Sequence, residues 1–146
     1  MSSLGSILER KNKSIDEVGP AATIFEAIGI MCRSHVGALL VNEHDRPIGI
    51  LSDGDIMRRV LLEGRDPSTT RVADVMTRDV VAAELHMEPE EAMAVMTERR
   101  LSQLPVVESK TVVGIISVCD LLTWRSSDQE FEIRTLKEYV SGGYPG

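Results

Sequence analysis

The chain has 146 residues, a formal net charge of −7 at pH 7, three histidines and two cysteines. Its length suits one compact body that needs neither a disulfide nor a metal to hold it together. The negative charge argues against nucleic acid as the main partner, because binding to the phosphate backbone relies on clustered Lys and Arg. The histidines and cysteines fall at no metal-ligand spacing, and the chain has neither a membrane-length apolar run nor the pattern of a secretory leader. We therefore expect a cytoplasmic protein without a metal or a membrane partner.

The first half of the chain alternates between helical and strand periodicity. The predicted elements are, in chain order, a short helix over 4–8, an edge strand over 15–18, a helix over 24–31, strands over 38–41 and 48–51, and a helix over 53–63. The charged, proline-bearing segment between the two longer strands predicts a hairpin turn. Gly64 would end the last helix.

The second half predicts the same order of elements after a polar, turn-rich linker over residues 65–70. These elements are a short docked segment over 72–76, a helix with Pro89 in its first turn, strands over 103–107 and 112–116, and a helix from 120 to 124. Ser127 and Glu130 then have the spacing of a capping box. They predict a further helix, up to Gly142, whose apolar residues are candidates for dimer contacts.

An internal repeat with an offset of 65 residues relates the two halves. Residues 26–56 align with residues 91–121 without a gap and are identical at ten of 31 positions. Roughly two identities are expected from ordinary residue frequencies. Such self-similarity indicates duplicated units that stack to bury a shared core. We predict a first unit over residues 1–72 with an N-terminal lead-in, a second unit over 73–126, and a C-terminal helix and tail over 127–146.

The repeated motif Ser-x-x-Asp occurs as Ser52 to Asp55 and as Ser117 to Asp120, each time directly after an apolar strand. One interpretation is structural, because such a serine caps a helix and the aspartate completes the capping box. The other is a nucleotide site. A helix N-terminus and a serine hydroxyl can bind phosphate, while a carboxylate one turn later can accept both hydroxyls of a ribose. The recurrence of the motif favours a ligand, without excluding the cap.

With its flanking residues, this motif resembles the cystathionine β-synthase (CBS) domain family, whose tandem pairs are called Bateman modules. The resemblance covers about residues 4–125. In the first unit it rests on Pro20, Thr23, Glu26, Ala27, Met31 and the segments 36–41 and 49–55. In the second it rests on Glu91, Ala92, Met96 and the segments 101–107 and 114–120, preceded by Val75-Met76-Thr77.

The resemblance implies an α+β fold of two β-α-β-β-α units packed with pseudo-twofold symmetry, with two clefts. Family members often bind AMP, ATP or another adenosine derivative there. It implies that Asp55 and Asp120 hold the ribose hydroxyls, that Ser52 and Ser117 approach phosphate, and that Arg58 is a further phosphate cation. The residues expected to frame the adenine are Thr23, Val36, Gly37, Ala38, Leu101, Ser102, Gln103 and Pro105.

The sequence departs from the family's pattern at four positions. Many relatives carry a basic residue directly before the motif aspartate, where this chain has Gly54 and Cys119. Leu85 and Glu88 stand where the second unit of relatives usually has proline and threonine. These departures predict weaker phosphate binding and a less complete adenine site in the second unit.

No Cys/His pair, Ser/His/Asp set or glycine-rich nucleotide loop predicts catalysis, so we do not expect an enzyme. The resemblance favours a regulatory module that binds AMP, ADP or ATP, requires no cofactor and alters the affinity of a separate, unidentified protein. The alternative is a constitutive dimerisation or scaffold module with vestigial clefts. S-adenosyl compounds and NAD-type ligands stay open, as does occupancy of one cleft or both. The resemblance also implies a homodimer.

Overall fold

The computed structural model describes residues 3–11 and 15–127 of the chain. Its elements repeat one arrangement twice, and this confirms the predicted α+β fold of tandem units. In chain order they are α1 (Leu4–Lys11), β1 (Glu17–Val18), α2 (Ile24–Ser34), β2 (Ala38–Glu43), β3 (Arg46–Ser52), α3 (Asp53–Ile56), the π-helical turn η1 (Met57–Leu61), α4 (Val72–Val75), β4 (Ala83–Glu84), α5 (Pro89–Arg99), β5 (Gln103–Glu108), β6 (Thr111–Ser117) and α6 (Val118–Ser127).

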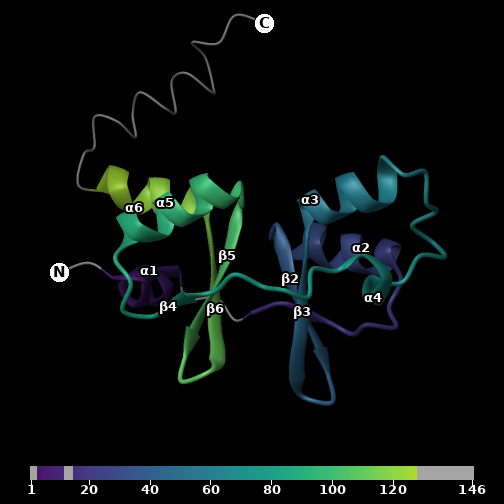
Figure 1. Cartoon of the computed structure of the whole chain (residues 1–146), viewed down its shortest axis with the longest axis horizontal. Coiled ribbons are helices and arrows are strands. Elements are labelled where there is room, and N and C mark those ends of the chain that lie inside the picture. Colours follow the sequence, from purple (N-terminus) through teal and green to yellow (C-terminus); the bar gives the residue numbers. More distant parts are fainter. Residues whose placement is uncertain (1–2, 12–14, 128–146) are drawn as a thin grey trace, which may run out of the picture.

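Two three-stranded sheets of the same topology form the frame of the protein (Figure 1). In the first sheet the order is β1-β2-β3, with β1 parallel to β2 and β2 antiparallel to β3; the second repeats this as β4-β5-β6. The register is also the same, because Leu40 pairs with Ile50 as Pro105 pairs with Ile115. Each hairpin turns through two residues with positive φ, as tight hairpin turns require. Equivalent residues of the repeat therefore occupy equivalent places.

The first core lies between the first sheet and the helices α2, α3 and α4. Ile24 of α2, Leu51 of β3 and Val60 of η1 are fully buried in it, because the apolar face of each element points inward. Val72 of α4 belongs to the same core. The segment 72–76 is therefore docked, as predicted, and it is docked on the first unit.

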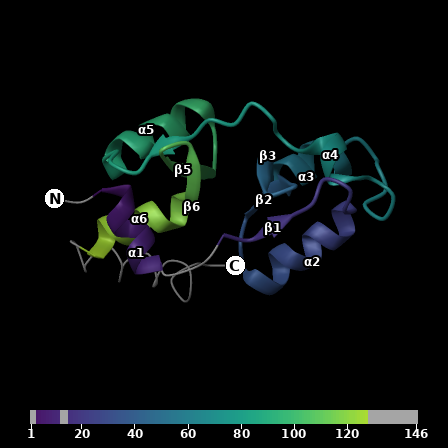
Figure 2. The same ribbon diagram turned by 90° about the horizontal axis from the view of Figure 1, so that it is seen from below.

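The second core lies between the second sheet and the helices α5 and α6, and it also receives α1. Leu4 and Ile7 of α1 are buried there with Met96 and Leu121. The structure thus differs from the predicted division, in which the N-terminal lead-in belongs to the first unit. The apolar spacing along α1 fits either core, and only the packing decides between them. Figure 2 shows α1 beside α6, on the far side of the second unit from α2.

The two sheets meet through apolar side chains on the faces that their own helices leave uncovered. This shared cluster is formed by Ala38, Leu40 and Ile50, packed against Ile15, Val80, Val112 and Ile115. Its members come from both sheets and from the segments that lead into β1 and β4. The two units therefore form one body, as the repeat predicts.

Two predicted helices differ in detail. The helix expected over 53–63 is α3 followed by the wider turn η1, in which the N–H of Leu62 donates to the carbonyl of Met57, five positions earlier, at 2.9 Å. Hydrophobic spacing over so few residues does not separate the two helix types. Gly64 follows with a φ of 71°, as expected. α6 extends to Ser127, the residue expected to cap a further helix, and the predicted tail helix lies outside the described residues.

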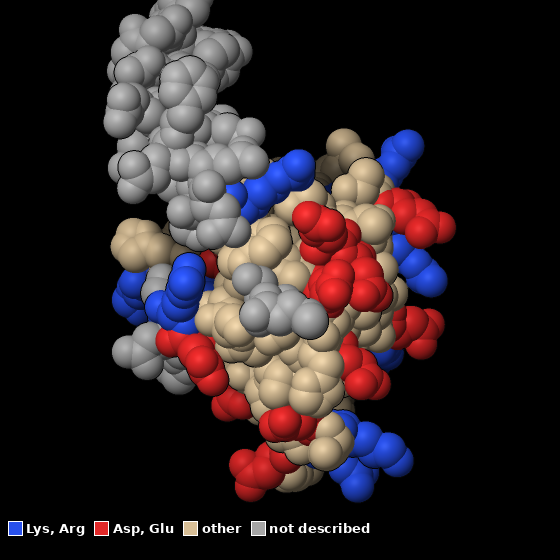
Figure 3. All heavy atoms as spheres, turned by 90° about the vertical axis from the view of Figure 1, so that its left-hand side faces the viewer, with Lys and Arg blue, Asp and Glu red and all other residues tan. Residues whose placement is uncertain are grey.

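The surface of the second unit mixes both signs of charge. On the face that Figure 3 shows, Lys and Arg side chains lie at the edges, and Asp and Glu side chains lie at the edges and to the right of the centre. Such a mixture differs from the clustered basic surface that nucleic-acid binding uses. Within the described ranges, no helix combines the length and the apolar character needed to cross a membrane.

Candidate functional site

Both Ser-x-x-Asp motifs form capping boxes where a strand passes into a helix. The N–H of Asp55 donates to the Ser52 hydroxyl at 3.1 Å, and the N–H of Ser52 donates to the Asp55 carboxylate at 3.0 Å. The corresponding distances for Ser117 and Asp120 are 3.1 and 2.8 Å. The structural interpretation of the motif is thereby confirmed. It also fixes each carboxylate at the start of a helix, α3 or α6, so any role in binding depends on what else reaches that carboxylate.

Two cavities lie where the units meet, and each takes residues from both units. The Asp120 cavity combines Ser117 and Asp120 of the second unit with Val36, Gly37 and Ala38 of the first. The Asp55 cavity combines Ser52, Asp55 and Arg58 of the first unit with Leu101, Ser102, Gln103 and Pro105 of the second. The pseudo-twofold therefore exchanges partners, so that the motif of one unit faces the strand edge of the other.

The Asp120 cavity has a volume of about 290 Å³, against about 120 Å³ for the Asp55 cavity. Only the first of these volumes approaches the lower end of small-molecule sites, about 300 Å³. The start of β2 lines it with the small residues Gly37 and Ala38. Because β1 pairs with β2 at Leu40 and Val41, it stops short of this start. The cavity thus has room for a ligand and borders a strand edge that β1 does not cover.

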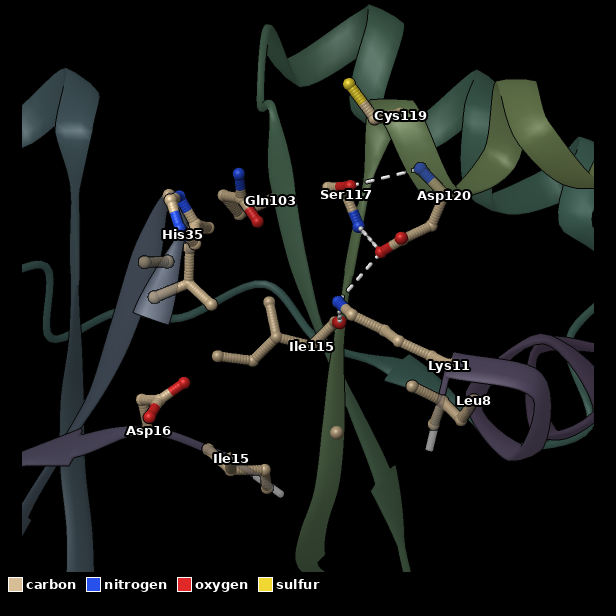
Figure 4. A pocket seen from close by; sticks show the side chains of 14 residues that line it. Leu8, Lys11, Ile15, Asp16, His35, Gln103, Ile115, Ser117, Cys119 and Asp120 are labelled. Carbon is tan, nitrogen blue, oxygen red and sulfur yellow. Dashed lines mark hydrogen bonds and ion pairs between the residues drawn. The ribbon is translucent and has the colours of Figure 1, made fainter. Parts of the chain in front are cut away.

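A lysine from α1 contacts the motif carboxylate of this cavity (Figure 4). Nζ of Lys11 lies 2.9 Å from Oδ2 of Asp120 and 2.9 Å from the carbonyl oxygen of Ile115. The same Oδ2 accepts the N–H of Ser117. The Asp120 side chain is 21% exposed. Its carboxylate is therefore anchored through one oxygen and is still accessible from the cavity.

Asp55, the repeat equivalent of Asp120, is enclosed by its neighbours. The residue is only 2% exposed. The hydroxyl of Thr77 lies 3.0 and 3.3 Å from its two carboxylate oxygens, and the Arg58 guanidinium lies 3.7 Å from Oδ1. A ribose could reach this carboxylate only if Thr77 moved away. The two motif aspartates thus have the same local geometry and different access.

The residues that the sequence singled out divide between the two cavities, with one exception. Gln103 lines both cavities, because it lies where they adjoin. Thr23, expected beside the adenine, lines neither of them. Its hydroxyl accepts the N–H of Glu26 at 3.1 Å and caps α2. The structure thus places the side chain of Thr23 at the start of α2 and in neither cavity.

Sequence reasoning missed several residues that line the cavities. His35 and Arg100 are repeat equivalents, end α2 and α5 in the left-handed conformation and face opposite cavities. His35 precedes Asp55 by the same number of positions as Arg100 precedes Asp120, and this regularity in the sequence could have revealed both. Lys11 carried no such signal, because it lies outside the aligned repeat. Thr77 was visible only as part of the family pattern.

The chemistry that these groups offer is that of binding. The Asp120 carboxylate accepts hydrogen bonds from hydroxyl groups, while the Lys11 ammonium group and the Ser117 hydroxyl donate to oxygen atoms of an anion. The dipole of α6 also favours an anion at the N-terminus of that helix. Among the residues that the structure describes, no three His, Cys, Asp or Glu side chains gather as a metal site.

Comparison with known proteins identifies the repeat. The family model for the CBS domain matches residues 11–62 and 72–127. The CBS domain-containing protein YhcV of Bacillus subtilis (strain 168) is 32% identical over 126 residues, which are 86% of this chain and 89% of that protein. A solved structure with CBS domains from Burkholderia ambifaria MC40-6 superposes with a TM-score of 0.84 at 34% identity, covering 89% of this chain and 98% of that chain.

A third similar structure has the same fold at lower identity. It is the CBS domain pair of protein MJ0100, solved in complex with 5′-methylthioadenosine and S-adenosyl-L-methionine. It superposes with a TM-score of 0.76 at 23% identity and covers 88% of this chain and 99% of that chain. The family match spans both units and includes both capping-box motifs. The chain therefore belongs to the CBS domain family and carries two CBS domains in tandem.

Proposed function

We propose that this protein is a non-catalytic regulatory module that binds an adenosine derivative in the Asp120 cavity and thereby changes its affinity for a separate protein. The observation that carries the proposal is the accessible Asp120 carboxylate, which lines a cavity of about 290 Å³ together with the start of β2. The carboxylate and the strand belong to different units. A ligand that contacts both would stabilise one arrangement of the two units.

Each part of such a ligand has a matching group. The two ribose hydroxyls donate to the Asp120 carboxylate, whose Oδ2 is already oriented by the N–H of Ser117 at 2.8 Å. The adenine lies between the apolar side chains of Val36 and Ile115, beside the backbone of Gly37. A phosphate faces the N-terminus of α6, where the helix dipole favours an anion and the Ser117 hydroxyl can donate to it.

The two cavities are not equivalent in this proposal. Asp55 is already satisfied by Ser52 and Thr77, and its cavity measures about 120 Å³. We therefore assign it a structural role and place the ligand at Asp120. The complex of the MJ0100 domain pair with two adenosine compounds supports the ligand class.

Regulation requires that the ligand distinguish between two states of the protein. Its effect on a partner cannot exceed the difference between its affinities for those states. The ligand would contact the shared cluster between the sheets through Ile15 and Ile115, which line the Asp120 cavity. Ligand binding could thus be transmitted through the packing that sets the relative position of the two sheets.

A thermal-shift series with AMP, ADP, ATP, NAD, S-adenosylmethionine and 5′-methylthioadenosine tests the proposal, with GTP as the control. A ligand at about 100 times its dissociation constant adds ~2.7 kcal/mol to the free energy of unfolding. At this chain length the melting midpoint should rise by roughly 5–10 °C. If every adenosine compound leaves the midpoint unchanged, the proposal fails and the scaffold alternative is favoured.

We also propose that the protein pairs with a second copy. Large apolar side chains on the helices of the first unit face solvent, and Leu62 is 82% exposed. Phe25, Met57 and Leu61 are exposed as well. Several large apolar side chains exposed on the helices of one unit favour association with another protein surface. The mass of the protein in solution decides between monomer and dimer.

A further inference from the structure

Lys11 reaches the Asp120 cavity from a helix that belongs to neither copy of the aligned repeat. Leu4 and Ile7 bury one face of α1 in the second core, and the N–H of Leu4 donates to the carbonyl of Met87 at 3.0 Å. These contacts hold the last residue of α1, Lys11, at the cavity wall (Figure 4). The family match begins at residue 11, so the rest of α1 lies outside it.

The ammonium group of Lys11 retains binding capacity. It has three N–H donors. The contacts of the described residues use two of them, one on Oδ2 of Asp120 and one on the carbonyl of Ile115, each at 2.9 Å. The side chain is 24% exposed. A third donor is thus available to an acceptor that enters the cavity beside the motif carboxylate.

Lys11 also supplies the positive charge of this cavity. Among the described residues that line it, Lys11 is the only Lys or Arg, while Asp16 and Asp120 are acidic. Without Lys11, a phosphate in the cavity would face two carboxylates. The residue directly before Asp120 is Cys119, which supplies no positive charge. The cation beside the motif carboxylate therefore comes from α1, a different element of the fold.

The Asp55 cavity has a different arrangement of charge. Arg58 and Arg100 line it, and both come from the repeat units themselves. The residue that follows Lys11 at the offset of the repeat is Met76, which lies outside the aligned segments and is buried in the first core. A lysine on the motif carboxylate is thus a property of one cavity and is not imposed by the repeat.

We propose that Lys11 makes the Asp120 cavity select adenosine ligands that carry a phosphate group. This inference rests on the proposed function, because it requires the adenosine to bind at Asp120. With the ribose hydroxyls on the carboxylate, the ammonium group lies between that carboxylate and the phosphate and offsets the charge of both. Adenosine itself gains no such contact. The cationic sulfonium of S-adenosylmethionine is disfavoured near the same ammonium group.

Isothermal titration of the full chain with AMP and with adenosine tests this role. The variants are Lys11→Met, which keeps the apolar stem and removes the charge, and Lys11→Arg, which keeps the charge. Lys110→Met is the matched control, because it removes one positive charge from the second unit at an exposed residue that lines neither cavity. The melting midpoint of each variant establishes that it is folded.

We expect the wild type to bind AMP about tenfold more tightly than adenosine, in line with a hydrogen bond to a charged group. Lys11→Met should lower the affinity for AMP by about tenfold and change that for adenosine less than about threefold. Lys11→Arg and Lys110→Met should keep the preference for AMP. Equal losses for both ligands in Lys11→Met, or tighter binding of both, would overturn the inference and leave the proposed function standing. Failure of the wild type to bind AMP would overturn the inference, and the proposed function falls with it only if no other compound of the thermal-shift series binds.

Discussion

Gly37 and Gln103 come from different units and lie so close that a Cβ atom on Gly37 would overlap the side-chain amide nitrogen of Gln103. Gly37 lines the Asp120 cavity, and Gln103 lines both cavities. The absence of a side chain at residue 37 therefore sets where the Gln103 amide lies. The contact joins the start of β2 to the start of β5, the two strand edges that the pseudo-twofold relates.

Gly37→Ala should displace the Gln103 side chain in the cavities and have only a small effect on the free energy of unfolding. The nearest obstacle is the end of the flexible Gln103 side chain, which can turn away, so we expect a loss of less than about 1 kcal/mol in the free energy of unfolding. Gly49→Ala is the contrasting variant, because its Cβ would lie 2.7 Å from the backbone oxygen of Thr77. That variant should lose about 1–3 kcal/mol. Urea denaturation measures both, and equal losses would contradict the role assigned to Gln103.

Asp120→Ala should weaken ligand binding in addition to removing a capping box, whereas Asp55→Ala should affect only the stability of the protein. Removing the accessible Asp120 carboxylate should weaken adenosine binding by about tenfold or more. Asp55→Ala should instead lower the free energy of unfolding by about 1–3 kcal/mol, because it leaves the N–H of Ser52 and the hydroxyl of Thr77 without their acceptor. Titration calorimetry and urea denaturation give the two quantities.

A matched control for this pair is Asp79→Ala. Asp79 lines the Asp55 cavity but is exposed. Its loss should therefore change neither the affinity nor the stability appreciably. If Asp55→Ala abolishes binding while Asp120→Ala does not, the ligand occupies the other cavity.

Shortening a buried side chain of α1 should lower both the free energy of unfolding and the affinity for AMP. Ile7 is 6% exposed and packs in that core, so Ile7→Ala should cost about 2–5 kcal/mol in the free energy of unfolding. Loosening of α1 should also displace Lys11 and lower the affinity for AMP. Glu9→Ala on the exposed side of α1 is the control and should change neither. Normal AMP affinity in a destabilised Ile7→Ala protein would show that Lys11 holds its place without α1.

Leu62→Glu should reduce self-association, because it places a charge on the most exposed of the apolar side chains. Light scattering coupled to size-exclusion chromatography measures the mass of the wild type and of the variant. We expect a dimer that is weakened by the substitution. Glu63→Lys, at the neighbouring exposed residue, controls for altered charge. A wild type that is monomeric at all concentrations would exclude the pairing.

The repeat and its motif made much of the fold predictable. An identical spacing of Ser52 and Asp55, and of Ser117 and Asp120, fixed two helix starts, since a capping box is a local structure of four residues. The alternating apolar runs likewise predicted the four longer strands. These features depend on near neighbours in the chain, and so periodicity and spacing record them.

The composition of each cavity was beyond sequence reasoning. The pseudo-twofold places the motif of one unit against the strand edge of the other. The spacing of residues in the sequence does not indicate whether a motif faces the strand edge of its own unit or that of the other unit. The enclosure of Asp55 depends on Thr77, 22 positions away. The contact of Lys11 with Asp120 spans 109 positions. Both contacts follow from the packing of whole elements and left no local signal.

Because α1 docks on the second unit, the two cores are completed at different times during synthesis on the ribosome. The first core uses residues from Val18 to Met76 and can close once that stretch has emerged. α1 leaves the ribosome earlier, yet its burial requires Met96 and Leu121, which are made much later. The apolar side of α1 must therefore stay unprotected until nearly all of the described residues have been translated.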